Sequence, residues 1–161
     1  ESARLAGVKR VIFASSGATI KGWEDVPPYD AIGQQRYEDV PESWPMITHE
    51  TPIRPVDLYA STKVWGEALG RSYSDTHGLS VICLRIGAVT KEDRPIMTRR
   101  WPIWCSQRDL AQLVRKCVEA PASLRYHTFY AVSNNTWGFH DFQHASEVLD
   151  YQPQDNAEQH R

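Results

Sequence analysis

The chain has 161 residues, of which 41% are hydrophobic and 24% are charged, and this balance is typical of one folded globular domain. It excludes a disordered or fibrous chain. The 18 basic and 20 acidic residues nearly cancel, so we expect no attraction to nucleic acid or to an anionic membrane, and a small molecule is the expected partner.

The first predicted elements are the end of a helix and a strand. Residues 1–7 are typical of a helix that stops at Gly7, and the apolar run RVIFA predicts a strand at 10–14. Residues 15–56 show no periodicity but carry six prolines and several aromatic residues, which is too apolar for a solvated linker. We therefore predict a long functional loop or an insertion there.

A long helix is predicted at about 57–77, where Asp57 can cap the start and Gly78 ends the run. The apolar spacing that favours this helix comes from Leu58, Ala68, Leu69 and Tyr73. The stretch LSVICLRIG that follows is almost wholly apolar, which predicts a parallel strand buried on both faces. Strand, helix and strand together predict a βαβ unit of an α/β fold.

After a second irregular stretch at 88–105, SQRDLAQLVRKCVEAP predicts a helix capped by Ser106. Its apolar stripe consists of Leu110, Leu113, Val114, Cys117 and Val118. HTFYAVS then predicts a strand, and DFQHASEVL predicts a short helix.

The N-terminal residues ESARLAGVKR carry no signal peptide, and no apolar run approaches the about 18 residues of a membrane span. The cytoplasm is therefore the predicted compartment. The three cysteines, Cys83, Cys105 and Cys117, are widely spaced and predict buried thiols instead of disulfides or zinc ligands.

Tyr59 and Lys63 in LYASTK can project side by side, because residues four apart lie on one helix face. An ammonium near a phenol favours the phenolate, and such a tyrosine can take the proton of an alcohol that becomes a carbonyl. Ser15 and Ser16 follow RVIFA, at the strand end where open α/β sheets bind ligands. Each feature alone has a simpler explanation: the spacing can arise by chance, and the serines can merely satisfy backbone groups.

Taken in this order, the elements resemble the extended short-chain dehydrogenase/reductase family of NAD-dependent sugar epimerases, dehydratases and dehydrogenases. The resemblance is carried by VKRVIFASS, HETPIRPVDLYASTK, WGEALGRSYSDTHGLSV and ICLRIG. Within the family, LRIGAVT, RRWPIWCSQRDLAQLV, VSNNTWGFHDF and YQPQDNAE are similar to the uronate dehydrogenase branch. The resemblance implies a Rossmann-type doubly wound parallel sheet, of which residues 1–161 form the C-terminal part.

The resemblance implies roles for five residues. Tyr59 matches the catalytic base, Lys63 matches the lysine that tunes it and holds the nicotinamide ribose, and Ser16 matches the hydroxyl that orients the substrate. Ile86 falls where the main chain approaches the nicotinamide, and Arg99 falls near the arginine that engages a sugar carboxylate. The implied cofactor is NAD, with NADP left open, and the implied substrate is a sugar or a sugar acid.

Three departures from the branch concern the substrate. Gly17 and Ala18 stand where the branch has Asn and His, and Ala88 stands where it has Ser. Gly17 stays a candidate substrate-side position, but the loss of three polar contacts predicts a different, less polar substrate. Residues 23–41 are predicted to be an insertion over the substrate pocket, within substrate-side loops at about 17–56 and 88–105.

The largest departure from the family pattern is at the N-terminus of the chain. The family holds its dinucleotide on a glycine-rich turn after the first strand, and the nine glycines here form no GxxGxxG. We therefore expect this chain to be incomplete and inactive alone, with an exposed apolar edge on its sheet. Members of the family commonly dimerise through the helix that bears YxxxK, so the resemblance also implies that a homodimer can form.

Two other hypotheses stay open. His140 and His144 in HDFQH have the spacing of a zinc-binding HExxH helix, with Asp in place of its Glu and no evident third ligand. The chain could also be a non-catalytic binding module that contacts a partner through its open edge or its tryptophan-rich loops. Dinucleotide binding discriminates an enzyme from such a module.

Overall fold

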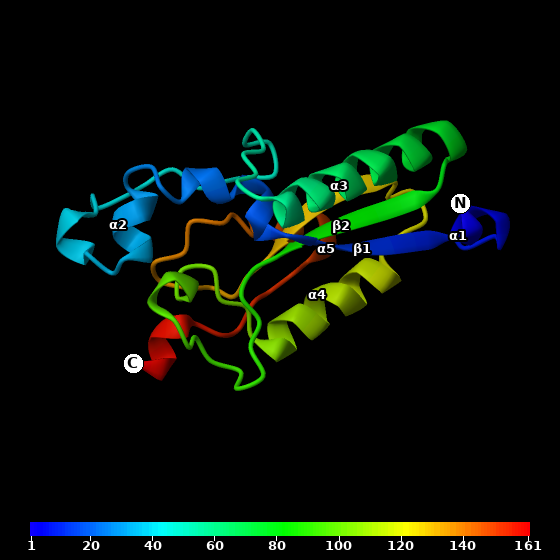
Figure 1. The fold of residues 1–161 in the computed structure, drawn as a ribbon. Coiled ribbons are helices and arrows are strands. Elements are labelled where there is room, and N and C mark those ends of the chain that lie inside the picture. Colours follow the sequence, from blue (N-terminus) through cyan, green and yellow to red (C-terminus); the bar gives the residue numbers. More distant parts are fainter.

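A three-stranded parallel sheet lies between two helical layers in the computed structural model, which describes residues 1–161 (Figure 1). The strand order is β1 (Arg10–Ser16), β2 (Ser80–Ile86) and β3 (Tyr126–Ala131). The α-helices are α1 (Ser2–Leu5), α2 (Tyr29–Gly33), α3 (Leu58–His77), α4 (Gln107–Glu119) and α5 (Gln143–Leu149), and the 3-10 helices are η1 (Gly17–Trp23), η2 (Tyr37–Asp39), η3 (Thr98–Arg100) and η4 (Ala157–His160). α3 covers one face of the sheet and α4 the other, which confirms the predicted Rossmann-type α/β architecture (Figure 1).

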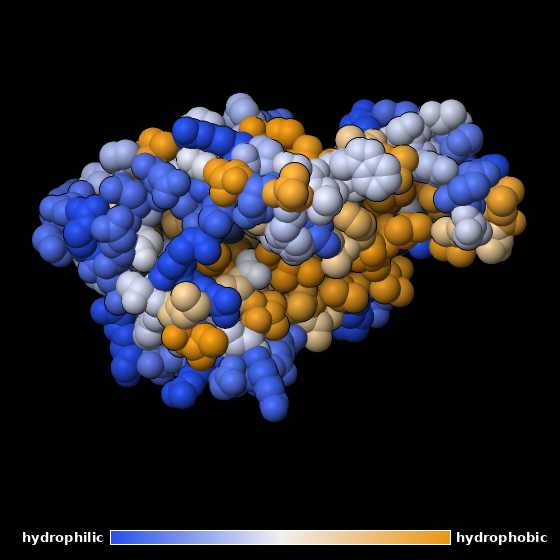
Figure 2. Space-filling model, viewed as in Figure 1, coloured by the Kyte–Doolittle hydropathy of each residue, from blue (hydrophilic) through white to orange (hydrophobic).

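β2 is the centre of the sheet, and every residue of it before Ile86 is buried, as its apolar sequence predicts. β1 pairs with β2 on one side only, and residues 11–13 of β1 are half-buried. β1 also runs two residues beyond RVIFA, because its two serines pair with Arg85 and Ile86 of β2. Figure 2 shows apolar side chains gathered over the region between α3 and α4, where β1 lies. The exposed apolar edge expected from the sequence is therefore present.

α3 begins and ends where the sequence predicts. The Asp57 carboxylate accepts a hydrogen bond from the Ala60 amide at 2.7 Å, and Gly78 adopts a φ of 66° at the C-cap.

The face that α3 buries differs from the prediction. Leu58 and Leu69 are exposed, and the buried residues of the helix are Ala60, Glu67 and Ser74. A Cβ on Gly66 would lie 2.3 Å from the Phe13 ring, so the missing side chain lets the helix approach β1 this closely. The periodicity located the helix but not its buried side, because small residues make this contact.

α4 is capped by the Ser106 hydroxyl, which accepts a hydrogen bond from the Asp109 amide at 3.1 Å. Leu113 and Cys117 from its predicted stripe enter the main core, but Val114 and Val118 are exposed. All three cysteines are buried free thiols, as predicted. None of the helices combines the length and the apolarity that crossing a membrane requires.

The stretches 17–56 and 88–105 are not open loops. With residues 130–139 they enclose a second core at the carboxyl ends of the strands, which we call the second lobe. Its buried residues are Ile20, Tyr29, Ile32, Ile47, Ile103, Tyr130, Val132 and Phe139.

Aromatic side chains hold the second lobe together. The Tyr37 and Trp137 rings stack with centroids 4.0 Å apart, and Trp44 stacks on Trp137 at 5.6 Å. Among the six tryptophans, Trp65 on α3 is the one whose side chain is exposed. The tryptophan-rich loops therefore do not form the exposed contact surface considered from the sequence.

Candidate functional site

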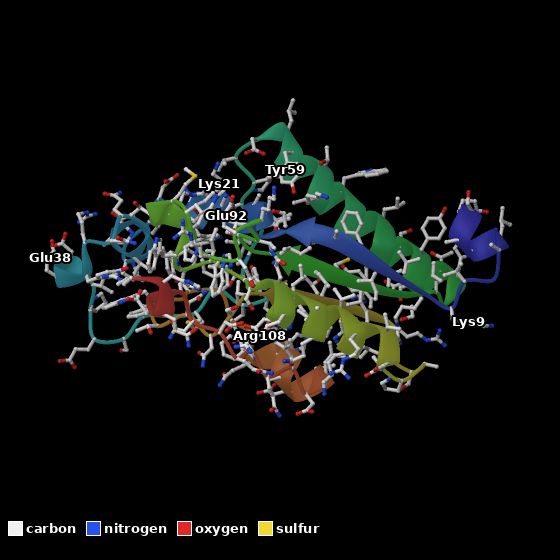
Figure 3. The ribbon with its side chains drawn as sticks, turned by 90° about the horizontal axis from the view of Figure 1, so that it is seen from below. Lys9, Lys21, Glu38, Tyr59, Glu92 and Arg108 are labelled. Carbon is white, nitrogen blue, oxygen red and sulfur yellow. The ribbon has the colours of Figure 1, made fainter.

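Tyr59 and Lys63 lie on the first turns of α3, next to the carboxyl end of β1. The Lys63 Nζ is 5.4 Å from the centroid of the Tyr59 ring and donates a hydrogen bond to the Ala14 carbonyl at 2.8 Å. Tyr59 is 56% exposed, and Figure 3 shows it at the start of α3. The predicted side-by-side arrangement is confirmed, with the ammonium fixed to the strand and the phenol open to solvent.

The two serines at the end of β1 point to different surroundings, since successive residues of a strand face opposite ways. Ser15 is buried and donates a hydrogen bond to Glu67 Oε1 at 2.6 Å. The Ser16 hydroxyl accepts one from the Ala18 amide at 3.1 Å and caps η1. Of the two serines, Ser16 is therefore the one whose hydroxyl lies at the start of η1. Its hydroxyl also satisfies a backbone amide, as considered from the sequence.

A buried ionic network, not identified from the sequence, joins α3 to the sheet. The Arg85 guanidinium donates to both oxygens of the Glu67 carboxylate, at 3.0 and 2.9 Å, and to the Tyr130 hydroxyl at 3.2 Å. Because Ser15 binds the same carboxylate, residues from β1, β2, β3 and α3 share one network. The available signal was Arg85 itself, a lone charge within a buried apolar strand, which requires a buried partner.

Gly17 and Ile86 lie next to Ser16, at the carboxyl ends of β1 and β2. A Cβ on Gly17 would come within 3.0 Å of His140 Cε1 and 3.7 Å of the Ile86 carbonyl oxygen. Ile86 pairs with Ser16 across the sheet, so the positions predicted for nicotinamide and substrate contacts are neighbours. Ala88 also lies at this end, where its amide donates to the Ile103 carbonyl at 2.7 Å.

His140 is a buried histidine and not part of a metal-binding helix. It precedes α5, whereas His144 lies within α5 and stacks on His49 with ring centroids 3.8 Å apart. The two histidines therefore do not share one helix, as the zinc hypothesis would require. His140 is 1% exposed, and neither ring nitrogen has a hydrogen-bond partner. Burial, together with the positive charges of Arg85 and Arg99, lowers the pKa of His140 to about 3. No three His, Cys, Asp or Glu side chains are placed to hold a metal ion.

Arg99, the predicted contact to a sugar carboxylate, binds a carboxylate of this chain. Its Nε and Nη2 both lie 2.6 Å from Glu24 Oε2. The Glu24 side chain is 10% exposed, and burial raises its pKa although the charge of Arg99 opposes this. Glu24 is the second residue of the segment 23–41 predicted as an insertion, so this segment contacts the Arg99 loop.

The sequence of this chain matches a described protein family and several known enzymes. Residues 1–109 match the model of the NAD dependent epimerase/dehydratase family. The chain is 34% identical over 152 residues to the NAD-dependent glucose-6-phosphate dehydrogenase of Haloferax volcanii, covering 94% of this chain and 55% of that protein. It is 32% identical over 158 residues to the uronate dehydrogenase of Pseudomonas syringae pv. tomato, covering 98% and 50%.

Solved structures agree with these matches. The crystal structure of uronate dehydrogenase from Agrobacterium tumefaciens superposes with a TM-score of 0.77 at 29% identity, over 98% of this chain and 51% of that one. A mutant of that enzyme complexed with NAD gives a TM-score of 0.75 at 28% identity, over the same 98% and 51%. The chain thus spans about half the length of the curated relatives it matches.

Proposed function

Because the chain belongs to the NAD dependent epimerase/dehydratase family, we propose that it carries the proton-transfer residues of an NAD(P)-dependent oxidoreductase or epimerase/dehydratase that acts on a sugar. One observation carries the proposal: a half-exposed phenol, that of Tyr59, lies beside the Lys63 ammonium at the carboxyl end of a parallel strand. Ligands of open α/β sheets bind at this end. The relatives named as sugar dehydrogenases support the same substrate class.

In this proposal Tyr59 accepts the proton of the substrate hydroxyl as that carbon becomes a carbonyl. The Lys63 ammonium favours the charged phenolate, since opposite charges within about 6 Å stabilise each other. Its bond to the Ala14 carbonyl keeps it from swinging away. The Ser16 hydroxyl aligns the substrate oxygen with Tyr59.

The residues present fit the nicotinamide end of NAD. Lys63 and Tyr59 would hold the ribose, and the main chain at Ile86 would face the carboxamide, because these groups meet at the ends of β1 and β2. When bound there, NAD supplies the hydride acceptor for the same carbon.

We further propose that residues 1–161 are the C-terminal portion of a single Rossmann-type domain. The open edge of β1 and its half-buried apolar residues support further strands on that side. The natural enzyme would act in the cytoplasm, where buried free thiols such as Cys83 stay reduced. A homodimer is proposed through α3, whose exposed Leu58, Trp65 and Leu69 offer an apolar face.

The second candidate function, a non-catalytic binding module, is favoured by that same open edge. Titration with NAD separates the two candidates. Measurable NAD binding by the natural polypeptide that contains this sequence supports the enzyme, whereas no binding supports the module.

Replacing Tyr59 by Phe in that polypeptide tests the catalytic assignment. We expect turnover to fall by about two to four orders of magnitude, because the proton acceptor is lost. The melting temperature should stay unchanged, since Tyr59 is half-exposed. Tyr73→Phe on the same helix is the matched control and should leave turnover unchanged. Wild-type turnover in Tyr59→Phe would refute the role of Tyr59.

A further inference from the structure

The Glu24–Arg99 ion pair joins two segments of the second lobe that are 75 residues apart. Both contacts of the guanidinium go to one carboxylate oxygen, at 2.6 Å. Arg99 is 48% exposed, whereas Glu24 is 10% exposed, so the carboxylate is the inner partner. A buried carboxylate of this kind depends on its cation, because leaving a buried charge unpaired is strongly unfavourable.

A cavity of about 120 Å³ lies against this pair. Its charged wall consists of Glu24, Asp25, Asp30 and Arg99, and Tyr29 and Phe139 add aromatic surface. Three carboxyl groups and one guanidinium therefore line the cavity, and the guanidinium is already paired with Glu24. Arg99 is the one basic residue of this wall, so its pairing with Glu24 leaves no cation of the wall free for a ligand. Asp30 is paired outside the wall, with Arg36 at 3.1 Å.

The cavity lies near the candidate catalytic residues. Glu24 directly follows η1, which starts at the residue after Ser16. On the other side, Phe139 precedes His140, whose ring packs against Gly17.

We propose that Glu24 makes this enzyme select an uncharged sugar, an aldose, over the corresponding sugar acid or sugar phosphate. The inference rests on the proposed function and narrows its substrate class. A substrate carboxylate near Arg99 would have to displace Glu24, and it would also face the carboxylates of Asp25 and Asp30. Hydroxyl groups meet no such repulsion and can donate hydrogen bonds to the same carboxylates.

The test compares D-glucose with D-glucuronate, which differ only in whether C6 is a hydroxymethyl or a carboxylate. Binding to the natural polypeptide that contains this sequence is measured by NMR titration in the Tyr59→Phe background. Recognition is thus measured without turnover. We expect glucose to bind at least about tenfold more tightly than glucuronate. Glu24→Gln frees Arg99 without changing the side-chain volume, and it should reduce this affinity ratio to about two or less.

Glu38→Gln is the matched control, because it removes an exposed carboxylate of the same segment that lies away from α3 (Figure 3). It should leave the ratio unchanged. Three outcomes would each overturn the inference. The Tyr59→Phe protein that retains Glu24 binds glucuronate more tightly than glucose, Glu24→Gln leaves the affinity ratio unaltered, or neither sugar binds. Hydride transfer by the protein with Tyr59 intact, measured separately with both sugars, decides the proposed function independently of these outcomes.

Discussion

His140 and Gly17 occupy space that only one side chain can fill. With a Cβ at position 17, the His140 ring would have to shift, since 3.0 Å is closer than ordinary van der Waals contact. The imidazole stacks on the Tyr130 ring at 4.6 Å and meets no polar partner at either nitrogen. Glycine at this position, which the sequence marks as a lost polar contact, therefore also makes room for a buried neutral histidine.

This burial predicts a pH-dependent stability. The pKa of His140 is lowered to about 3 in the folded chain. Between that value and the ordinary histidine pKa, the unfolded chain binds a proton at His140 and the folded chain does not. The stabilisation is complete above about pH 6.5 and falls by about 1.4 kcal/mol per pH unit below it, down to the folded pKa.

Urea denaturation between pH 4 and pH 7 would measure this dependence. In His140→Phe, which keeps a ring on Tyr130, we expect the free energy of unfolding to fall less steeply with decreasing pH. His77→Gln, at an exposed position of α3, is the control and should keep the wild-type slope. An equal slope in His140→Phe and wild type would contradict the prediction.

At the scale of elements, α3 is held on the sheet by close backbone approach and by one buried ion pair. Glycines let the helix approach β1 and β2, and the Glu67 carboxylate binds Arg85 of β2 and Ser15 of β1. Because Tyr59 and Lys63 lie on the same rigid helix, this pair sets their rotation toward the strand ends. A helix held only by apolar contacts would lack such a directional constraint.

Glu67→Met should therefore destabilise the chain by about 3–5 kcal/mol, because Arg85 would stay buried without its charged partner. The double variant Glu67→Met with Arg85→Met should recover most of this loss, since two apolar side chains can pack together. Urea denaturation measures both. Arg71→Ala, which breaks the exposed Arg71–Asp75 pair of the same helix, is the control and should have a much smaller effect. A double variant no more stable than Glu67→Met would count against the pairing.

At the scale of the whole molecule, the open side of β1 distinguishes this chain from a closed domain. Apolar surface gathers around β1 (Figure 2). Val118 of α4 is 63% exposed and lines one surface pocket together with Val8, which is also exposed. Contiguous apolar surface of this kind marks a contact site or an aggregation hazard.

We accordingly expect the 161-residue chain to self-associate at micromolar concentrations in sedimentation velocity. Val118→Lys should shift it toward the monomer, because a charge would then have to be desolvated in the contact. Val89→Lys, at an exposed position of the second lobe, is the control. A chain that stays monomeric, or one that Val118→Lys leaves unaltered, would show that this edge drives no association.

Local signals in the sequence predicted most of the sheet and both covering helices. The caps at Asp57 and Ser106, the stop at Gly78 and the apolar run of β2 all act between neighbouring residues, so they can be read without knowing the fold. The family, too, followed from motifs, and the four-residue spacing of Tyr59 and Lys63 predicted that their side chains lie together.

What only the tertiary structure decided are pairings between distant residues. The sequence could not tell that Ser15 binds Glu67 or that Glu24 pairs with Arg99. Nor could it tell that the stretch 17–56 packs with residues 88–105 and 130–139 around a second core. Backbone hydrogen bonds and caps depend on a few adjacent residues. The partner of a buried charge depends on which segments pack together, and that is settled only when the whole chain folds.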